Sequence, residues 1–156
     1  EGADGSVYRA DLDGEVNRIA NGLASPTGMV WSQDASTLFV SETGQNRIVS
    51  LDLDDAGENL ENQQTLANFE NGTPGALMFD SQGNLYVAVQ GVGIVILDDA
   101  GDVVETLEIG SGRLAGMAFG GLDYDDLYVA DTEEGKVYCC HREVSGQRPF
   151  AGPRSV

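Results

Sequence analysis

Basic residues are scarce in this chain: eight Lys and Arg stand against 26 Asp and Glu, which gives a formal net charge of −18. A field of this sign repels phosphate backbones and anionic bilayers, so we expect no nucleic acid or membrane as a partner. Long apolar segments are also missing, because no run reaches the 18 or more residues of a membrane span. The start at Glu1 shows no basic leader and no apolar segment of a signal peptide. A soluble protein is expected.

Sulfur and imidazole chemistry is limited. The two cysteines, Cys139 and Cys140, are adjacent, and neighbouring side chains on a strand point to opposite faces. A bond between them would be strained, so we predict free thiols and favour a cytoplasmic over a secreted protein. His141, the only histidine, follows them, and its side chain projects away from that of Cys140. We interpret it as a surface residue of an edge strand rather than a catalytic base.

Helical periodicity is absent as well, because 21 glycines interrupt the chain every few residues. What recurs instead is a short strand: Leu38-Phe39-Val40, Leu85-Tyr86-Val87 and Leu127-Tyr128-Val129. The leucines are 47 and 42 residues apart (85 − 38 and 127 − 85). A four-stranded propeller blade needs roughly 40 to 50 residues, so the sequence predicts an all-β fold with about three four-stranded β-propeller blades.

The turn signals show no linker, so we predict one domain over residues 1–156 with about thirteen strands. It divides into an outer hairpin at 5–20, a blade at 26–70, a blade at 74–110, and a partial blade at 114–142 with a tail. The turns at 32–36, 80–84 and 120–126 contain several carboxylates. We interpret these as turn-forming groups rather than calcium loops, because none has the alternating ligands and closing Glu of an EF-hand.

Strands that alternate in direction bring two sets of turns to one face of the predicted blades. Thr27, Gly75 and Ala115 begin the first strands there, and Gln90 lies in a turn between second and third strands. Two arginines flank the same face and suit a carboxylate or phosphate ligand, although the first can instead balance Glu42. We therefore predict a ligand pocket of Thr27, Gly75, Ala115, Gln90, Arg47 and Arg113.

Glu42 and Asp131 occupy equivalent positions after the second strands of two blades. Over the mouth of the channel they could each act as general base, metal ligand or hydrogen-bond acceptor. The alternative is that both are solvated loop acids. They are the candidate catalytic residues of the sequence.

Several motifs together resemble the gluconolactonase/regucalcin (senescence marker protein) family. They are the segments 22–29 and 38–43, Pro74, Asp80, 83–88, 118–121, 126–129, 135–138 and 144–146. The resemblance implies a six-bladed propeller of which this chain corresponds to the second half. It also implies hydrolysis of sugar lactones with one divalent cation, calcium or similar, held by a Glu, an Asn and an Asp. The Asn position falls at Thr27 and the Asp position at Gly75, while the Glu segment lies outside this chain.

Three hypotheses follow. The first is a gluconolactonase-like lactone or ester hydrolase with replaced metal ligands, whose ligand is a sugar lactone or sugar acid. The second is a non-catalytic half-propeller that binds a small ligand or a partner and self-associates to complete the ring, the alternative being a partial chain. The third is a strictosidine-synthase-like propeller, on the strength of Ser41-Glu42-Thr43.

Overall fold

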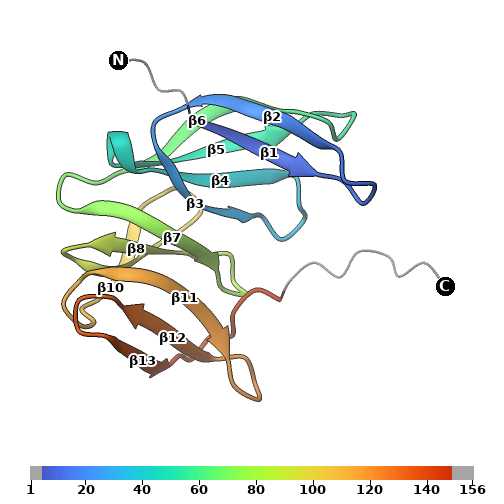
Figure 1. Cartoon of the computed structure of the whole chain (residues 1–156). Helices are drawn as coiled ribbons and strands as arrows, with labels where there is room; N and C mark the ends of the chain where they lie inside the picture. The colour runs from blue at the N-terminus through green and yellow to red at the C-terminus, as the bar shows by residue number, and fades with distance from the viewer. Residues whose placement is uncertain (1–4, 149–156) are drawn as a thin grey trace.

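The structure is a computed structural model that describes residues 5–148. These residues form a succession of antiparallel strands connected by turns (Figure 1). The strands are β1 (Gly5–Ala10), β2 (Val16–Leu23), β3 (Pro26–Trp31), β4 (Thr37–Glu42), β5 (Arg47–Leu53), β6 (Leu60–Asn68), β7 (Thr73–Phe79), β8 (Leu85–Gln90), β9 (Gly93–Leu97), β10 (Val103–Leu107), β11 (Leu114–Gly120), β12 (Asp126–Asp131) and β13 (Lys136–His141). In this part of the chain, the helix content is one 3-10 turn over Thr43–Gln45. No helix there is long and apolar enough to cross a bilayer.

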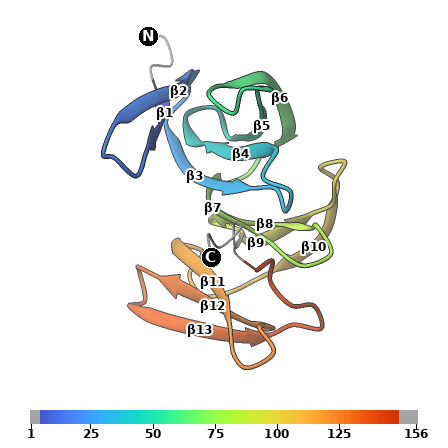
Figure 2. The ribbon, with the colours of Figure 1, turned by 90° about the vertical axis from the view of Figure 1, so that its right-hand side faces the viewer.

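The strands form four antiparallel sheets in sequence order: β1–β2, β3–β4–β5–β6, β7–β8–β9–β10 and β11–β12–β13. The first strands of the last three sheets, β3, β7 and β11, lie next to one another, and the later strands fan outward from them (Figure 2). Meander sheets stacked about a shared axis are the blades of a β-propeller, so the predicted fold is confirmed.

The sheet β7–β10 has a separate hydrophobic core on each of its faces, because successive side chains of a strand point to opposite faces. β8 sends Leu85, Val87 and Val89 toward the sheet before it, and Tyr86 and Ala88 toward the sheet after it. All five side chains are buried. A strand covered on both faces reads as a continuous apolar run, which explains the hydrophobic segment from 85 to 89.

Each of these two cores contains an aromatic pair that connects neighbouring sheets. Phe39 and Phe79 meet edge to face at 5.1 Å between the sheets β3–β6 and β7–β10, and Tyr86 and Phe119 do so at 5.4 Å on the other side. Such pairs contribute about 0.5–1.5 kcal/mol beyond their buried area.

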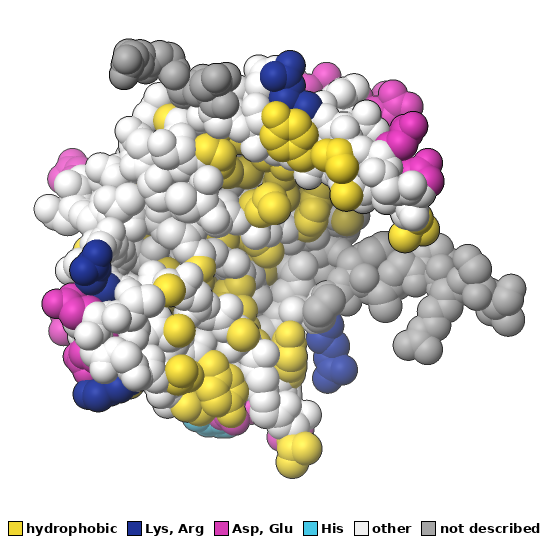
Figure 3. Space-filling view, viewed as in Figure 1, with side chains coloured by type: hydrophobic (Ala, Val, Ile, Leu, Met, Phe, Trp, Pro, Cys, Tyr) yellow, Lys and Arg dark blue, Asp and Glu magenta, His cyan; other side chains and the backbone are white. Residues whose placement is uncertain are grey.

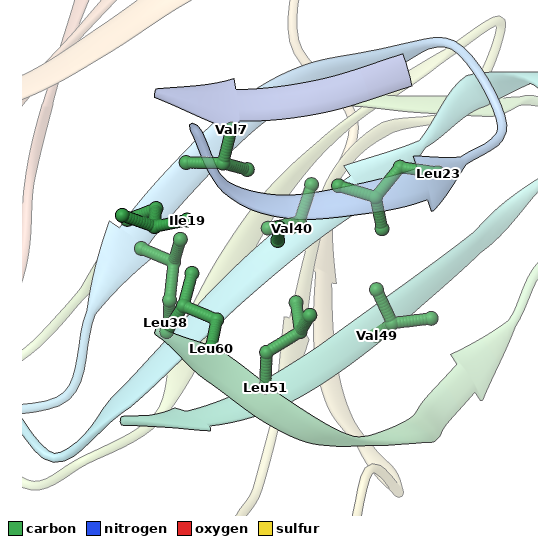
Figure 4. Close-up of a cluster of buried hydrophobic side chains, with 9 residues drawn as sticks. Val7, Ile19, Leu23, Leu38, Val40, Val49, Leu51 and Leu60 are labelled. Carbon is green, nitrogen blue, oxygen red and sulfur yellow. The ribbon is translucent and has the colours of Figure 1, made fainter. Parts of the chain in front are cut away.

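The hairpin β1–β2 covers the outer face of the sheet β3–β6. Its side chains Val7, Ile19 and Leu23 join a third core with side chains of β4, β5 and β6 (Figure 4). No sheet of the described chain covers β11–β13 in the same way, so Tyr128 of β12 is 39% exposed. The two ends of the sheet stack therefore differ.

Candidate functional site

A cleft of about 280 Å³ opens on the face where β3, β7 and β11 begin. On this face, the first residues of β3, β7 and β11 lie beside the turns that follow β4, β8 and β12. The cleft is lined by Thr27, Thr43, Thr73, Pro74, Gly75, Ala88, Gln90, Arg113, Leu114 and Thr132.

The lining is rich in hydroxyl groups. Four threonines and Gln90 supply neutral hydrogen-bonding groups, and Arg113 supplies the one charge among the lining residues. No lining residue is acidic. Hydroxyl and amide groups pair with the hydroxyls of a polyol, and a guanidinium pairs with a carboxylate in a bidentate manner. This set of groups fits a small polyhydroxylated ligand that is neutral or anionic.

Four of the six residues predicted for the pocket line this cleft: Thr27, Gly75, Gln90 and Arg113. Ala115 lies in the same strand as Leu114 and is exposed, but it is outside the cleft lining. Arg47 is outside it too, because its guanidinium donates to Glu42 Oε2 at 2.5 Å and to Thr65 Oγ1 at 3.2 Å.

The position of Glu42 in the sequence suggested a side chain over the mouth of the channel. In the structure this side chain does not line the cleft. It is fully buried at the end of β4. One carboxylate oxygen accepts the Ala24 N–H at 2.6 Å and the other accepts from Arg47. A buried carboxylate needs such partners, and here they hold the turn before β3 in place.

Asp131 has the same arrangement at the end of β12, where it is 3% exposed. Its oxygens accept the backbone N–H groups of Glu134, Ser111 and Glu133 at 2.6–2.9 Å, and also the Ser111 hydroxyl. These bonds, led by that from Glu134, lower the pKa of the Asp131 carboxyl. Both candidate catalytic carboxylates thus make hydrogen bonds within the chain rather than facing the cleft, and their catalytic role stays a prediction.

The residues that follow these two acids were missed by the sequence analysis. Thr43 Oγ1 donates to the Ser25 carbonyl at 2.7 Å, and Thr132 Oγ1 donates to the Arg113 carbonyl at 3.0 Å. Both threonines line the cleft. A repeated acid–threonine pair at 42–43 and 131–132 was the available signal. In each pair the acid is buried and the threonine lines the cleft.

The family positions for a metal do not provide a suitable donor set here. Gly75 has no side chain, and its carbonyl already accepts the Ser41 hydroxyl at 2.6 Å. Thr27 brings one hydroxyl, and the cleft lining brings no carboxylate. A divalent cation of the calcium type takes six to eight oxygen ligands, several of them from carboxylates. These residues therefore do not fit such an ion by themselves.

Comparison with known proteins identifies a family model and several relatives that match this chain. It matches the family described as SMP-30/Gluconolactonase/LRE-like region over residues 1–141. Regucalcin of Danio rerio is 27% identical over 153 residues, which cover 96% of this chain and 50% of the relative. A pentonolactonase of Haloferax volcanii is 28% identical over 130 residues, which cover 81% and 45%. The chain spans about half the length of the curated relatives it matches.

Solved structures of similar proteins superpose on this chain. Luciferin-regenerating enzyme superposes with a TM-score of 0.80 at 26% identity, over 94% of this chain and 55% of that protein. A gluconolactonase of Xanthomonas campestris superposes with a TM-score of 0.71 at 27% identity, over 83% and 42%.

Proposed function

Because this chain belongs to the SMP-30/gluconolactonase/LRE-like family, we propose that its threonine-lined cleft binds a sugar lactone or the sugar acid formed from it. The observation that carries the proposal is the lining itself, whose polar side chains are four hydroxyls, one amide and a single guanidinium. Relatives named as a pentonolactonase and a gluconolactonase support this class of ligand.

Arg113 has the leading role in this proposal. It is exposed at the cleft, and no salt bridge to a described carboxylate occupies its guanidinium. It can therefore pair with the carboxylate of a sugar acid or donate to the carbonyl oxygen of a lactone. The threonines and Gln90 would then bind the ring hydroxyls.

Hydrolysis of the lactone is the finer part of the proposal. Opening the ring requires a base to activate water and donors to stabilise the charge on the carbonyl oxygen. Arg113 is such a donor, whereas no lining residue is a carboxylate base. We expect the chain on its own to bind the ligand with little turnover, and a base from outside the lining to be needed for full activity.

The test uses the full chain with an aldonolactone and its aldonate, titrated by calorimetry, while a pH-stat records acid release. Arg113→Gln should weaken aldonate binding about tenfold or more, because a charged hydrogen bond contributes about 1.5–3 kcal/mol. Arg18→Gln removes the same charge at an exposed site outside the cleft and should leave binding unchanged.

Equal affinity of Arg113→Gln and the parent chain, or no binding at all, would refute the proposal. Turnover that a chelator abolishes would favour a metal-dependent lactonase. Binding without turnover would favour the non-catalytic alternative.

A second candidate function is assembly. The outer face of β11–β13 is uncovered in the described chain, and Tyr128 and Val137 are exposed on adjacent strands of it. We propose that a second copy covers this face and so extends the ring of blades.

A further inference from the structure

Two carboxylates and the only histidine of the chain converge at the end of the last sheet that is remote from the cleft. Asp126 begins β12 and is the direct cross-strand partner of His141, the last residue of β13. Asp125 precedes that strand. Nδ1 of His141 lies 3.2 Å from Asp126 Oδ1 and 3.7 Å from Asp125 Oδ1.

One ligand atom from each of the three side chains lies within 4.8 Å of the other two. We propose that Asp125, Asp126 and His141 form a surface site for Zn²⁺ or a chemically similar divalent cation. The proposal is independent of the proposed function, because β12 separates the two places: Asp131, at its other end, is five strand steps or roughly 17 Å away.

The donor set favours zinc over calcium. Zinc binds imidazole nitrogen and carboxylate oxygen at about 2.0–2.2 Å, commonly with three protein ligands and a water. Calcium requires six to eight oxygen ligands, and an imidazole supplies none. A cluster that combines one nitrogen with two carboxylates therefore suits the smaller ion.

The electrostatic surroundings also favour a cation. Within residues 5–148, the salt bridges of both carboxylates go to His141 alone, without a lysine or arginine. The nearby Arg142 donates instead to Glu105 at 2.5 Å and lies over the Tyr86 ring. Two carboxylates in a chain of net charge −18 thus remain to be balanced from solution.

The cluster is accessible and its backbone is held in place. The His141 side chain is 72% exposed, and those of Asp125 and Asp126 are 27% and 32% exposed. Figure 3 shows the histidine at the lower edge of the molecule, beside acidic side chains. The Arg142 N–H donates to the Asp125 carbonyl at 2.8 Å, which ties the loop before β12 to the end of β13. A cation can therefore enter from solution without unfolding of this region.

The test exploits the single histidine. In the full chain without an affinity tag, the imidazole nitrogen resonances observed by NMR come from His141 alone. Zn²⁺ added at neutral pH should shift them with saturation at one equivalent, and the same concentration of Ca²⁺ should not. Asp126→Asn and Asp125→Asn should each weaken Zn²⁺ binding at least tenfold. The control Asp99→Asn removes one exposed charge in the turn before β10 and should bind as the parent does.

Cys139 is an exposed free thiol two residues before His141 in β13, so Cys139→Ser is tested beside these variants. Unchanged binding by Cys139→Ser supports the proposal. Imidazole resonances that do not move, binding by Asp126→Asn and Asp125→Asn equal to that of the parent, or loss of binding in Cys139→Ser alone would each overturn it. Circular dichroism of every variant verifies that the strands are intact.

Discussion

Glu42 and Asp131 are buried acids that shape the cleft without lining it. Each lies at the end of a second strand and accepts a backbone N–H from the segment that leads into a first strand, Ala24 in one sheet and Ser111 in another. The residue after each acid then faces the cleft as a threonine. The position of the cleft thus depends on two carboxylates that a ligand would not touch.

The hydrogen bonds to Asp131 predict a pH dependence of stability. They hold the pKa of its carboxyl below the usual value of 3.8 in the folded chain. The unfolded chain then takes up this proton at a higher pH than the folded chain does. The contribution of Asp131 to the free energy of unfolding is fully present above the pKa of this carboxyl in the unfolded chain. It is lost as the pH falls through the pKa in the folded chain.

Asp131→Asn should therefore reduce the acid-induced drop in the urea midpoint, measured from pH 6 down to pH 2.5. Hydrogen bonds from Ser32 and Ser36 lower the pKa of Asp34 to about 2. Asp34 therefore also contributes to the loss of stability in acid, and this part of the loss should remain in Asp131→Asn. Glu133→Gln, next to the site, serves as the control. If the urea midpoint of Asp131→Asn falls as steeply with pH as that of the parent, Asp131 does not contribute to the acid sensitivity.

Local sequence predicted the strands but not the contacts of single side chains. The repeated Leu-aromatic-Val segments placed the second strands, and turn formers separated the rest. Whether Glu42 faces solvent or the Ala24 N–H depends on a contact across 18 residues. The meeting of Asp126 with His141 likewise depends on the register of β12 and β13, which only the folded sheet reveals.

At the scale of strands, the sheets β3–β6 and β7–β10 leave no room for a side chain at Gly28, where β3 passes β7. A Cβ added at Gly28 would lie 2.0 Å from the Gly75 carbonyl oxygen. That oxygen also accepts the Ser41 hydroxyl, so it is held from a second side. Glycine at position 28 is therefore needed for the two first strands to meet at the cleft.

Gly28→Ala should destabilise the chain by about 1–3 kcal/mol, because backbone must move to relieve the overlap. Gly75→Ala provides a matched comparison in the neighbouring strand. Its Cβ would meet only the Ala88 carbonyl, at 3.5 Å, so its stability should stay within about 0.5 kcal/mol of the parent. Urea unfolding measures both variants. Equal stabilities of the two would show that β3 and β7 are not packed as described.

At the scale of the whole molecule, the stack of sheets has one covered and one uncovered end. The hairpin β1–β2 packs on β3–β6, whereas the outer face of β11–β13 presents Tyr128 and Val137. Hydrophobic side chains also gather around β1–β3, as Figure 3 shows. Exposed apolar faces of this kind commonly mark interfaces.

We expect sedimentation of the chain at tens of micromolar to give about twice 16.5 kDa. Tyr128→Asp combined with Val137→Asp should shift it to the monomer, because two charges would be buried in the contact. Leu122→Asp, in an exposed loop, should leave the mass unchanged. Added salt should favour the dimer, since two copies with charges of −18 repel each other. A compact parent monomer would exclude this assembly.

The space beside Gly75 makes the cleft open to redesign. Apart from the adjacent residues, a Cβ at this position would meet no atom nearer than 3.5 Å, and Gly75 lies in the cleft lining, so the backbone here has room for a side-chain Cβ. An aspartate at this position would add an acid to a lining whose polar side chains are now hydroxyls, an amide and a guanidinium. The scaffold thus allows an engineer to change the charge of the cleft while its framework of strands stays as it is.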